Sequence, residues 1–322
     1  MAPDGGRRLT LRVLFAAAEL APLSKVGGLG DVAAALPEAL ARAGAEVTIV
    51  TPLHTVVRQK AALEGLPTRT LSYTFGGRSR TARLIETRVP GGSVPVHLLE
   101  DPALFETGPE VYGRETGPDG VGDLRWFAFS AALREVTRAL DLRPQILHLH
   151  DWHTALAAVL WRTDHAFDEE AAGTACVLTL HNVAYQGQCS PADWRRTGLR
   201  DDLLNDWCLL SQGEVNPLKA GILFAERITT VSPGYAQEIL GSEGRGLTAV
   251  LESRQDDLEG ILNALDPQAW DPATDENLAQ TYDAKNLEGR RASKRALAAE
   301  LELNAPEGPL VAYVGRLTEQ KG

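Results

Sequence analysis

The chain has 322 residues, 44% of them apolar and 23% charged, a composition typical of a globular protein with one large domain or two ordinary ones. Its formal net charge of −11 argues against general binding to nucleic acid or anionic membranes, because both attract basic surfaces. No apolar run approaches the roughly 18 residues that a membrane-spanning helix needs.

The cysteines and the N-terminal segment indicate in which cellular compartment we expect the protein. The three cysteines follow neither a disulfide nor a zinc-binding spacing, so we expect a reducing, cytoplasmic environment. Arg7 and Arg8 precede an apolar stretch, as in a secretion signal. Because Glu19 interrupts this stretch and a glycine-rich segment follows directly, we interpret it as a first β-strand.

Apolar, β-rich runs alternate with helical patterns. We predict strands at 11–17, 46–52, 94–100, 145–150, 176–182 and 227–232, helices at 31–44 and 125–140, and a hairpin within 70–95. In the first helix, Pro37 predicts a kink or a late start, and Gly44 predicts the end. The alternation predicts an α/β fold with a parallel sheet, whose ligands bind at the carboxyl ends of the strands.

The first candidate site is SKVGGLGDV, residues 24–32, which follows the first strand. A strand, a glycine loop and a helix in this order point backbone N–H groups at an anion. The spacing matches neither the dinucleotide fingerprint nor the P-loop, because Lys25 precedes the glycines. The alternative is a turn in which Gly27, Gly28 and Gly30 only tolerate positive φ.

The second candidate site is HLHDWHTAL, residues 148–156. His148 and His150 share one face of the strand, and we expect buried hydrogen bonds to explain His148. Asp151 falls at the carboxyl end of the strand, and we expect a helix from about Thr154. We consider Asp151 and His153 the better candidates for contacting a polar ligand, while a metal-hydrolase pattern fails by one position.

The third candidate site is TLHNVAYQG, residues 179–187, where a strand ends at His181. A single histidine at a strand end is more often structural than catalytic. Two strand ends, at Asp151 and His181, together predict a shared crevice at one edge of the sheet.

Residues 264–308 change in character, from a proline- and aspartate-rich connector to a charged helical pattern. A new strand is then predicted at 309–315, with Arg316 and Lys321 beyond it, where a phosphate would lie. Because a buried parallel strand needs neighbours on both sides, we expect the sequence to stop just inside a second domain.

Six segments in order resemble the bacterial glycogen synthases and plant starch synthases: KVGGLGDV, HLHDWHTAL, TLHNVAYQG, VNPLKAGILFAERITTVSPGYAQEI, GILNALDPQAWDPATD and VGRLTEQKG. The resemblance runs from residue 11 to the last residue. It implies a GT-B architecture of two Rossmann-like domains: an N-terminal domain over 9–263, a connector and helix over 264–308, and the start of a second domain over 309–322.

The resemblance also implies an activity: glucose transfer from ADP-glucose to the non-reducing end of an α-1,4-glucan such as glycogen, with retention and with no metal or other cofactor. The implied donor contacts are Lys25, Gly27, Gly28, Asn263, Arg316 and Lys321, and the implied catalytic residues are Asp151, His181, Arg316 and Lys321. Asp151 and His181 would lie by the transferred glucose, and the Arg316–Lys321 pair would neutralise the diphosphate. Stabilising departing phosphate charge is a main electrostatic task in such a reaction.

The sequence departs from the family at three places. Ala264 stands where the family usually has glycine, ETGPEVYG at 106–113 is a loose version of the acceptor-side loop, and the rest of the second domain is missing. We therefore expect this 322-residue chain to be inactive by itself. The alternatives are a UDP-glucose-dependent transferase of the sucrose synthase type, a non-catalytic glucan-binding module and, more remotely, a metal hydrolase. The sequence does not indicate the oligomeric state.

Overall fold

The computed structural model describes residues 10–106, 108–112, 122–169, 171–266, 270–303, 308–315 and 317. The chain divides into two compact units, Met1–Asn263 and Ala264–Gly322. Within the described ranges, no helix is long and apolar enough to cross a membrane.

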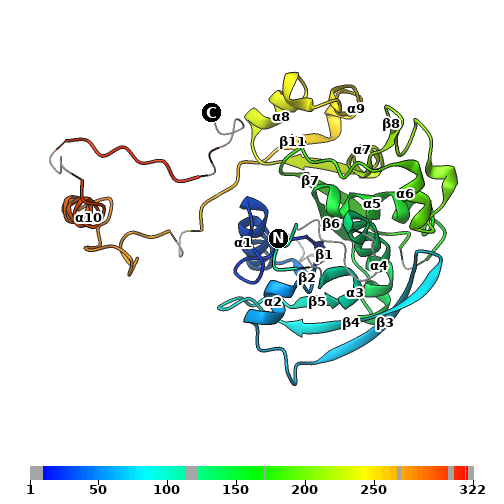
Figure 1. Ribbon diagram of the computed structural model, residues 1–322, viewed down its shortest axis with the longest axis horizontal. Helices are drawn as coiled ribbons and strands as arrows, with labels where there is room; N and C mark the ends of the chain where they lie inside the picture. Colours follow the sequence, from blue (N-terminus) through cyan, green and yellow to red (C-terminus); the bar gives the residue numbers. More distant parts are fainter. Residues whose placement is uncertain are drawn as a thin grey trace, which may run out of the picture. The chain divides into compact units, whose positions relative to one another are not determined.

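The first unit is built on a nine-stranded sheet, counted over the described residues (Figure 1). Its strands are β1 (Arg12–Ala16), β2 (Glu46–Pro52), β3 (Thr68–Phe75), β4 (Arg78–Thr87), β5 (Val96–Glu100), β6 (Ile146–His150), β7 (Ala175–Leu180), β10 (Arg227–Thr230) and β11 (Leu258–Gly260). A separate ribbon pairs β8 (Leu210–Ser211) with β9 (Glu214–Val215). The six strands predicted between residues 11 and 232 are therefore confirmed, and β11 was not predicted.

The strand order is β11-β10-β7-β6-β1-β2-β5-β4-β3, and the strands from β11 to β5 all pair in parallel. The chain moves outward from β1 through β2 to β3 at the edge, comes back through β4 to β5, and then crosses to place β6 on the other side of β1. Such a reversal creates a crevice at the carboxyl ends of the two central strands, which is where ligands bind in open α/β sheets.

Helices cover the sheet on both sides. They are α1 (Gly28–Arg42), α2 (Thr55–Lys60), α3 (Pro102–Phe105), α4 (Arg125–Ala139), α5 (Asp151–Arg162), α6 (Pro191–Arg196), α7 (Pro217–Phe224), α8 (Pro233–Ile239) and α9 (Thr248–Glu252), with 3-10 turns η1 (Gly122–Leu124), η2 (Asp201–Leu203), η3 (Ser242–Gly244) and η4 (Gln255–Asp257). Helix α5 packs against both α4 and α7, and α1 contacts β2. Figure 1 draws α1 on one side of β1 and α4 and α5 on the other, as right-handed crossovers in opposite directions require.

Helix α1 departs from its prediction at one end and agrees at the other. It starts at Gly28 and continues through Pro37, so the expected late start is wrong. Pro37 is tolerated because it extends a buried stripe at four-residue spacing with Leu29 and Ala33. The helix ends where predicted: Gly44 has φ +100, and its N–H donates to the Ala41 carbonyl oxygen at 3.0 Å.

The predicted hairpin is also confirmed, and it extends the sheet with two antiparallel strands. Phe75 of β3 pairs with Arg78 of β4 across Gly76 and Gly77, whose φ values are +66 and +69. Positive φ at both central residues belongs to the type I′ turn, whose twist matches that of the flanking strands. Strand β4 then pairs antiparallel with β5.

The second unit contains one helix among its described residues, α10 (Glu288–Glu300), within the predicted charged pattern. Residues 309–315, predicted as a strand, belong to no strand in the structure. The physical reason is the lack of a partner, because a strand needs a hydrogen-bonded neighbour and no other strand occurs in the described part of this unit.

Candidate active site

Three sequence-predicted segments meet at the carboxyl edge of the sheet. The glycine segment follows β1, Asp151 follows β6 and His181 follows β7, and these strands are neighbours. Asp151 connects two of the segments directly, because its Oδ1 accepts the backbone N–H of His181 at 2.7 Å and that of Asn182 at 3.4 Å. The predicted shared edge is therefore present in the fold.

Asp151 occupies an unusual backbone position. Its φ is +54, a left-handed conformation that aspartate tolerates better than most residues. It is the first residue of α5, so the helix starts three residues earlier than the predicted Thr154. Burial raises the pKa of Asp151, while the nearby His181 and the N–H donors of His181 and Asn182 oppose that shift. The turn thus holds a buried carboxylate where β6 ends.

The glycine segment is organised by a residue that the sequence analysis considered only as a break in an apolar run. Oε2 of Glu19 accepts the backbone N–H groups of Val26 at 2.7 Å and Gly27 at 2.9 Å. Its Oε1 accepts the hydroxyl of Tyr112 at 2.5 Å. Two N–H groups of the predicted anion site are therefore bound by the chain's own carboxylate. A single acidic residue in the otherwise apolar FAAAEL segment was the available signal.

Tyr112 is the second residue that the sequence analysis missed, since it was seen only as part of a loose acceptor-side loop. Its ring packs 4.9 Å from that of His153 and 5.9 Å from that of Trp126. Burial and the adjacent Glu19 carboxylate raise the pKa of Tyr112 well above its usual range. The phenol therefore stays protonated and serves as a donor to Glu19.

Gly27 and Gly28 are not explained by their backbone conformation. Neither has positive φ, so the turn alternative is wrong for both. A Cβ on either would meet no heavy atom of the described residues within 4 Å, whereas one on Gly30 would lie 3.2 Å from Oε2 of Glu19. Among the described residues, the N–H groups of Gly28 and Leu29 have no acceptor. Open space and free donors therefore coincide at the start of α1.

Lys25 lies beside this helix terminus but is not free. Its Nζ is 2.7 Å from Oδ1 of Asp31, and both side chains are about half exposed. A surface pair of this kind contributes little stability, so a ligand anion can compete for the ammonium at small cost.

The histidines of the second motif occupy different surroundings. Nε2 of His148 lies 2.8 Å from Oγ1 of Thr179, so the expected hydrogen bond is present, in a partly buried position. His153 is 7% exposed and lies among the rings of Tyr112, Trp126 and Trp152. The structure therefore places His153 in an aromatic cluster beneath the edge, whereas Asp151 lies at the edge itself.

The remaining predicted site residues lie near the end of the first unit or outside the described ranges. Asn263 is exposed, and its N–H donates to the Val231 carbonyl oxygen at 3.2 Å. Arg316 and Lys321 lie outside the described residues. In the ranges that the structure describes, no group of three histidine, cysteine or acidic side chains could hold a metal ion, so the metal-hydrolase alternative finds no ligand set there.

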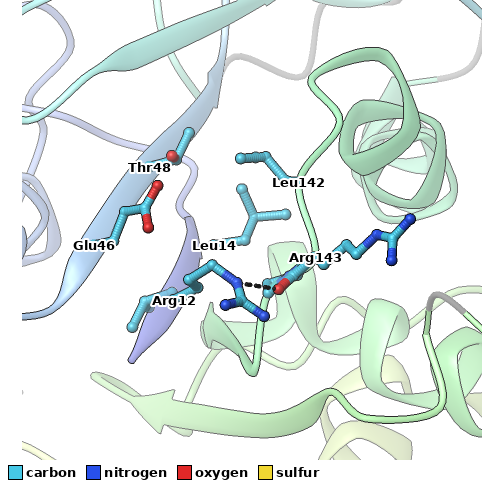
Figure 2. A pocket seen from close by; sticks show the side chains of 8 residues that line it. Arg12, Leu14, Glu46, Thr48, Leu142 and Arg143 are labelled. Carbon is cyan, nitrogen blue, oxygen red and sulfur yellow. Dashed lines mark hydrogen bonds between the residues drawn. The ribbon is translucent and has the colours of Figure 1, made fainter. Parts of the chain in front are cut away.

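A small hollow lies at the opposite, amino edge of the sheet (Figure 2). It is lined by the starts of β1 and β2 and by the segment before β6, and Nε of Arg12 donates to the carbonyl oxygen of Arg143 there at 2.7 Å. The hollow has room for about one water molecule. It is too small for a nucleotide or a sugar.

The buried histidines predict a loss of stability in mild acid. Burial lowers the pKa of His54 to about 4 and that of His148 to about 3, and it lowers the pKa values of His150 and His153 well below the ordinary value. Below about pH 6.5 the unfolded chain binds protons that the folded chain excludes, so the free energy of unfolding falls as the pH drops. The slope is at most about 1.4 kcal/mol per pH unit for each histidine. Urea unfolding at about pH 7.5 and pH 5.5 measures it, and equal free energies would contradict the burial of neutral imidazoles.

Comparison with known proteins gives three consistent findings. A family model described as the starch synthase catalytic domain matches residues 12–253. Glycogen synthase of Anaeromyxobacter sp. (strain Fw109-5) is 42% identical over 314 residues, and glycogen synthase 2 of Geobacter metallireducens is 39% identical over 319. Each alignment covers 97% of this chain and 64% of the relative. The chain therefore spans about two thirds of the length of these curated relatives.

A solved structure matches as well. The catalytic domain of starch synthase IV from Arabidopsis thaliana, bound to ADP and acarbose, superposes with a TM-score of 0.82 at 34% sequence identity. The match covers 93% of this chain and 61% of that chain.

Proposed function

The chain belongs to the glycogen synthase and starch synthase family of glycosyltransferases, and on that premise we propose that it serves glucose transfer from ADP-glucose to an α-1,4-glucan. The donor is bound at the carboxyl edge of β1, β6 and β7, and the transferred glucose lies by Asp151 and His181. The acceptor is the non-reducing end of glycogen, and the anomeric configuration is retained.

The observation that carries the proposal is the pair Gly27–Gly28. Neither positive φ nor a protein neighbour requires glycine at these positions. The absence of two side chains leaves space directly over unpartnered N–H groups at the start of the 15-residue helix α1. A helix N-terminus with free donors favours an anion, so a diphosphate is a suitable occupant.

The other proposed donor contacts include three cationic side chains that offset the negative charge of the diphosphate. Lys25 leaves its ion pair with Asp31 and binds the donor instead. Asn263, at the end of the first unit, also contacts the donor. Arg316 and Lys321 neutralise the diphosphate as it departs. Two fixed cations would stabilise the negative charge that develops on the leaving group in the transition state.

ADP-glucose is proposed over UDP-glucose on family membership, since the relatives are glycogen synthases and the matched starch synthase structure holds ADP. A competition experiment, in which each nucleotide sugar displaces a fluorescent ADP analogue, separates the two donors. Stronger displacement by UDP-glucose would favour the sucrose synthase type. We place the protein in the cytoplasm, because all three cysteines are free thiols.

Gly28→Val should weaken ADP-glucose binding at least tenfold, because the new side chain fills the space over the free N–H groups. The free energy of unfolding should stay within about 0.5 kcal/mol, since valine suits a helix slightly better than glycine. Isothermal titration calorimetry measures the first quantity and urea unfolding the second.

Gly173→Val is the matched control. A Cβ on Gly173 also meets no described heavy atom within 4 Å, but this residue precedes β7 and lies at the amino edge of the sheet. It should bind ADP-glucose as the wild-type chain does. Equal affinity in the Gly28 and Gly173 variants would remove the glycine pair from the donor site.

A further inference from the structure

His150 is the last residue of β6 and is fully buried, at 0% exposure. Its Nδ1 lies 3.0 Å from Nε2 of His181, the residue that follows β7 at the candidate active site. His148, two residues earlier on the same face, bonds Thr179 instead. One buried imidazole therefore connects the sheet interior to a proposed site residue.

The ring of His150 has little freedom to turn. Its centroid lies 4.2 Å from that of Phe15 and 4.4 Å from that of His148, with which it stacks. Its backbone is also held, because its N–H donates to Oγ1 of Thr154 at 2.6 Å. The direction of Nδ1 toward His181 is thus set by packing on both sides.

The surroundings of Nε2 indicate which nitrogen of the His150 ring carries the proton. Burial keeps His150 neutral, so it carries one proton. In the part of the chain that the structure describes, Nε2 of His150 is buried without a hydrogen-bond partner. A proton there would leave an orphaned N–H group, which is rarer in folded proteins than an unpaired acceptor. The proton therefore belongs on Nδ1, from which it is donated to His181.

We propose that His150 is a positioning residue that selects the tautomer of His181. Since Nε2 of His181 accepts from His150, the neutral ring of His181 carries its proton on Nδ1. His181 then offers an N–H donor to the site, and the matching ligand group is a hydroxyl oxygen of the bound sugar. The choice of ligand rests on the proposed function, but the choice of tautomer does not.

The tautomer can be measured without any ligand. In the 15N-labelled chain at about pH 7.5, ring nitrogen shifts should show His181 protonated at Nδ1 and bare at Nε2. In His150→Phe the donor is lost, and His181 should move toward the Nε2–H form. In His150→Asn the side-chain amide restores a donor on the same carbon, so the Nδ1–H form should persist. A protonated Nε2 in the wild-type chain would overturn the proposal even if no variant folded.

His148→Phe is the matched control for packing. It removes the neighbouring stacked imidazole, while Thr179 retains Thr229 at 2.7 Å. Its His181 tautomer should equal that of the wild type. A shift equal to that of His150→Phe would mean that packing, rather than the hydrogen bond, controls His181.

ADP-glucose titration adds a functional readout. His150→Phe should weaken binding about tenfold, whereas His150→Asn and His148→Phe should stay within about twofold, since one lost hydrogen bond corresponds to about that change. Unchanged affinity in His150→Phe would overturn the role of the donor while leaving the proposed function intact. Absence of binding in the wild-type chain would instead count against the proposed function, and the tautomer measurement would still decide the role of His150.

Discussion

Replacing Gly187 by alanine is expected to lower the free energy of unfolding by about 3 kcal/mol. Gly187 has φ +71, and its Cβ would lie 2.1 Å from Cε3 of Trp152. Trp152 cannot move aside easily, because it is 8% exposed and packs 4.2 Å from the ring of His153. The variant must therefore strain its backbone and displace a buried ring next to Asp151. Urea unfolding measures the loss.

Gly213→Ala separates the cost of backbone strain from the cost of displacing a buried ring. Gly213 also has positive φ, +84, but its Cβ would meet no described heavy atom within 4 Å. This variant should lose only the backbone part, about 1 kcal/mol. If both variants lost the same amount, the contact between Gly187 and Trp152 would carry no weight.

Replacing Asp151 by alanine is expected to weaken ADP-glucose binding about 100-fold, which corresponds to about 2.7 kcal/mol. The substitution removes the acceptor of two backbone N–H groups and places alanine at φ +54. The segment after β7, with His181, then loses both backbone hydrogen bonds that Asp151 accepts from it. The free energy of unfolding should fall by about 2 kcal/mol, because two partly buried N–H groups lose a charged acceptor.

Asp151→Asn separates the effect of the turn conformation on donor binding from the effect of the carboxylate charge. Asparagine accepts a left-handed φ and keeps a carbonyl acceptor for His181, so its stability should stay within about 1 kcal/mol of wild type. Its affinity for ADP-glucose should fall about fivefold to tenfold, since a carboxylate makes the stronger hydrogen bond to a sugar hydroxyl. Wild-type affinity in both variants would contradict the placement of the donor at Asp151.

The sequence pattern predicted helices and strands well where only a few neighbouring residues determine the local structure. The buried strands, the hairpin within 70–95 and the end of α1 at Gly44 each follow from short-range rules and are confirmed. Strand β11 was missed because it has only three residues. The late start considered because of Pro37 did not occur, since burial against the sheet outweighs the local penalty.

The candidate site was predicted only in outline. Parallel-sheet topology was enough to bring Asp151 and His181 to one edge. The bond between Tyr112 and Glu19 was not predictable, because it joins residues 93 positions apart. The left-handed φ of Asp151 likewise depends on the partner segment after β7.

The carboxyl edge of β1, β6 and β7 is proposed to bind a sugar nucleotide. Backbone amide NMR of the 15N-labelled chain during titration with ADP-glucose tests it most directly, because it detects weak binding and locates it. We expect saturable shifts of the amides of Gly27, Gly28 and His181, with none at Gly173. Shifts confined to the amino edge of the sheet, or no shift at millimolar ADP-glucose, would contradict donor binding at the carboxyl edge.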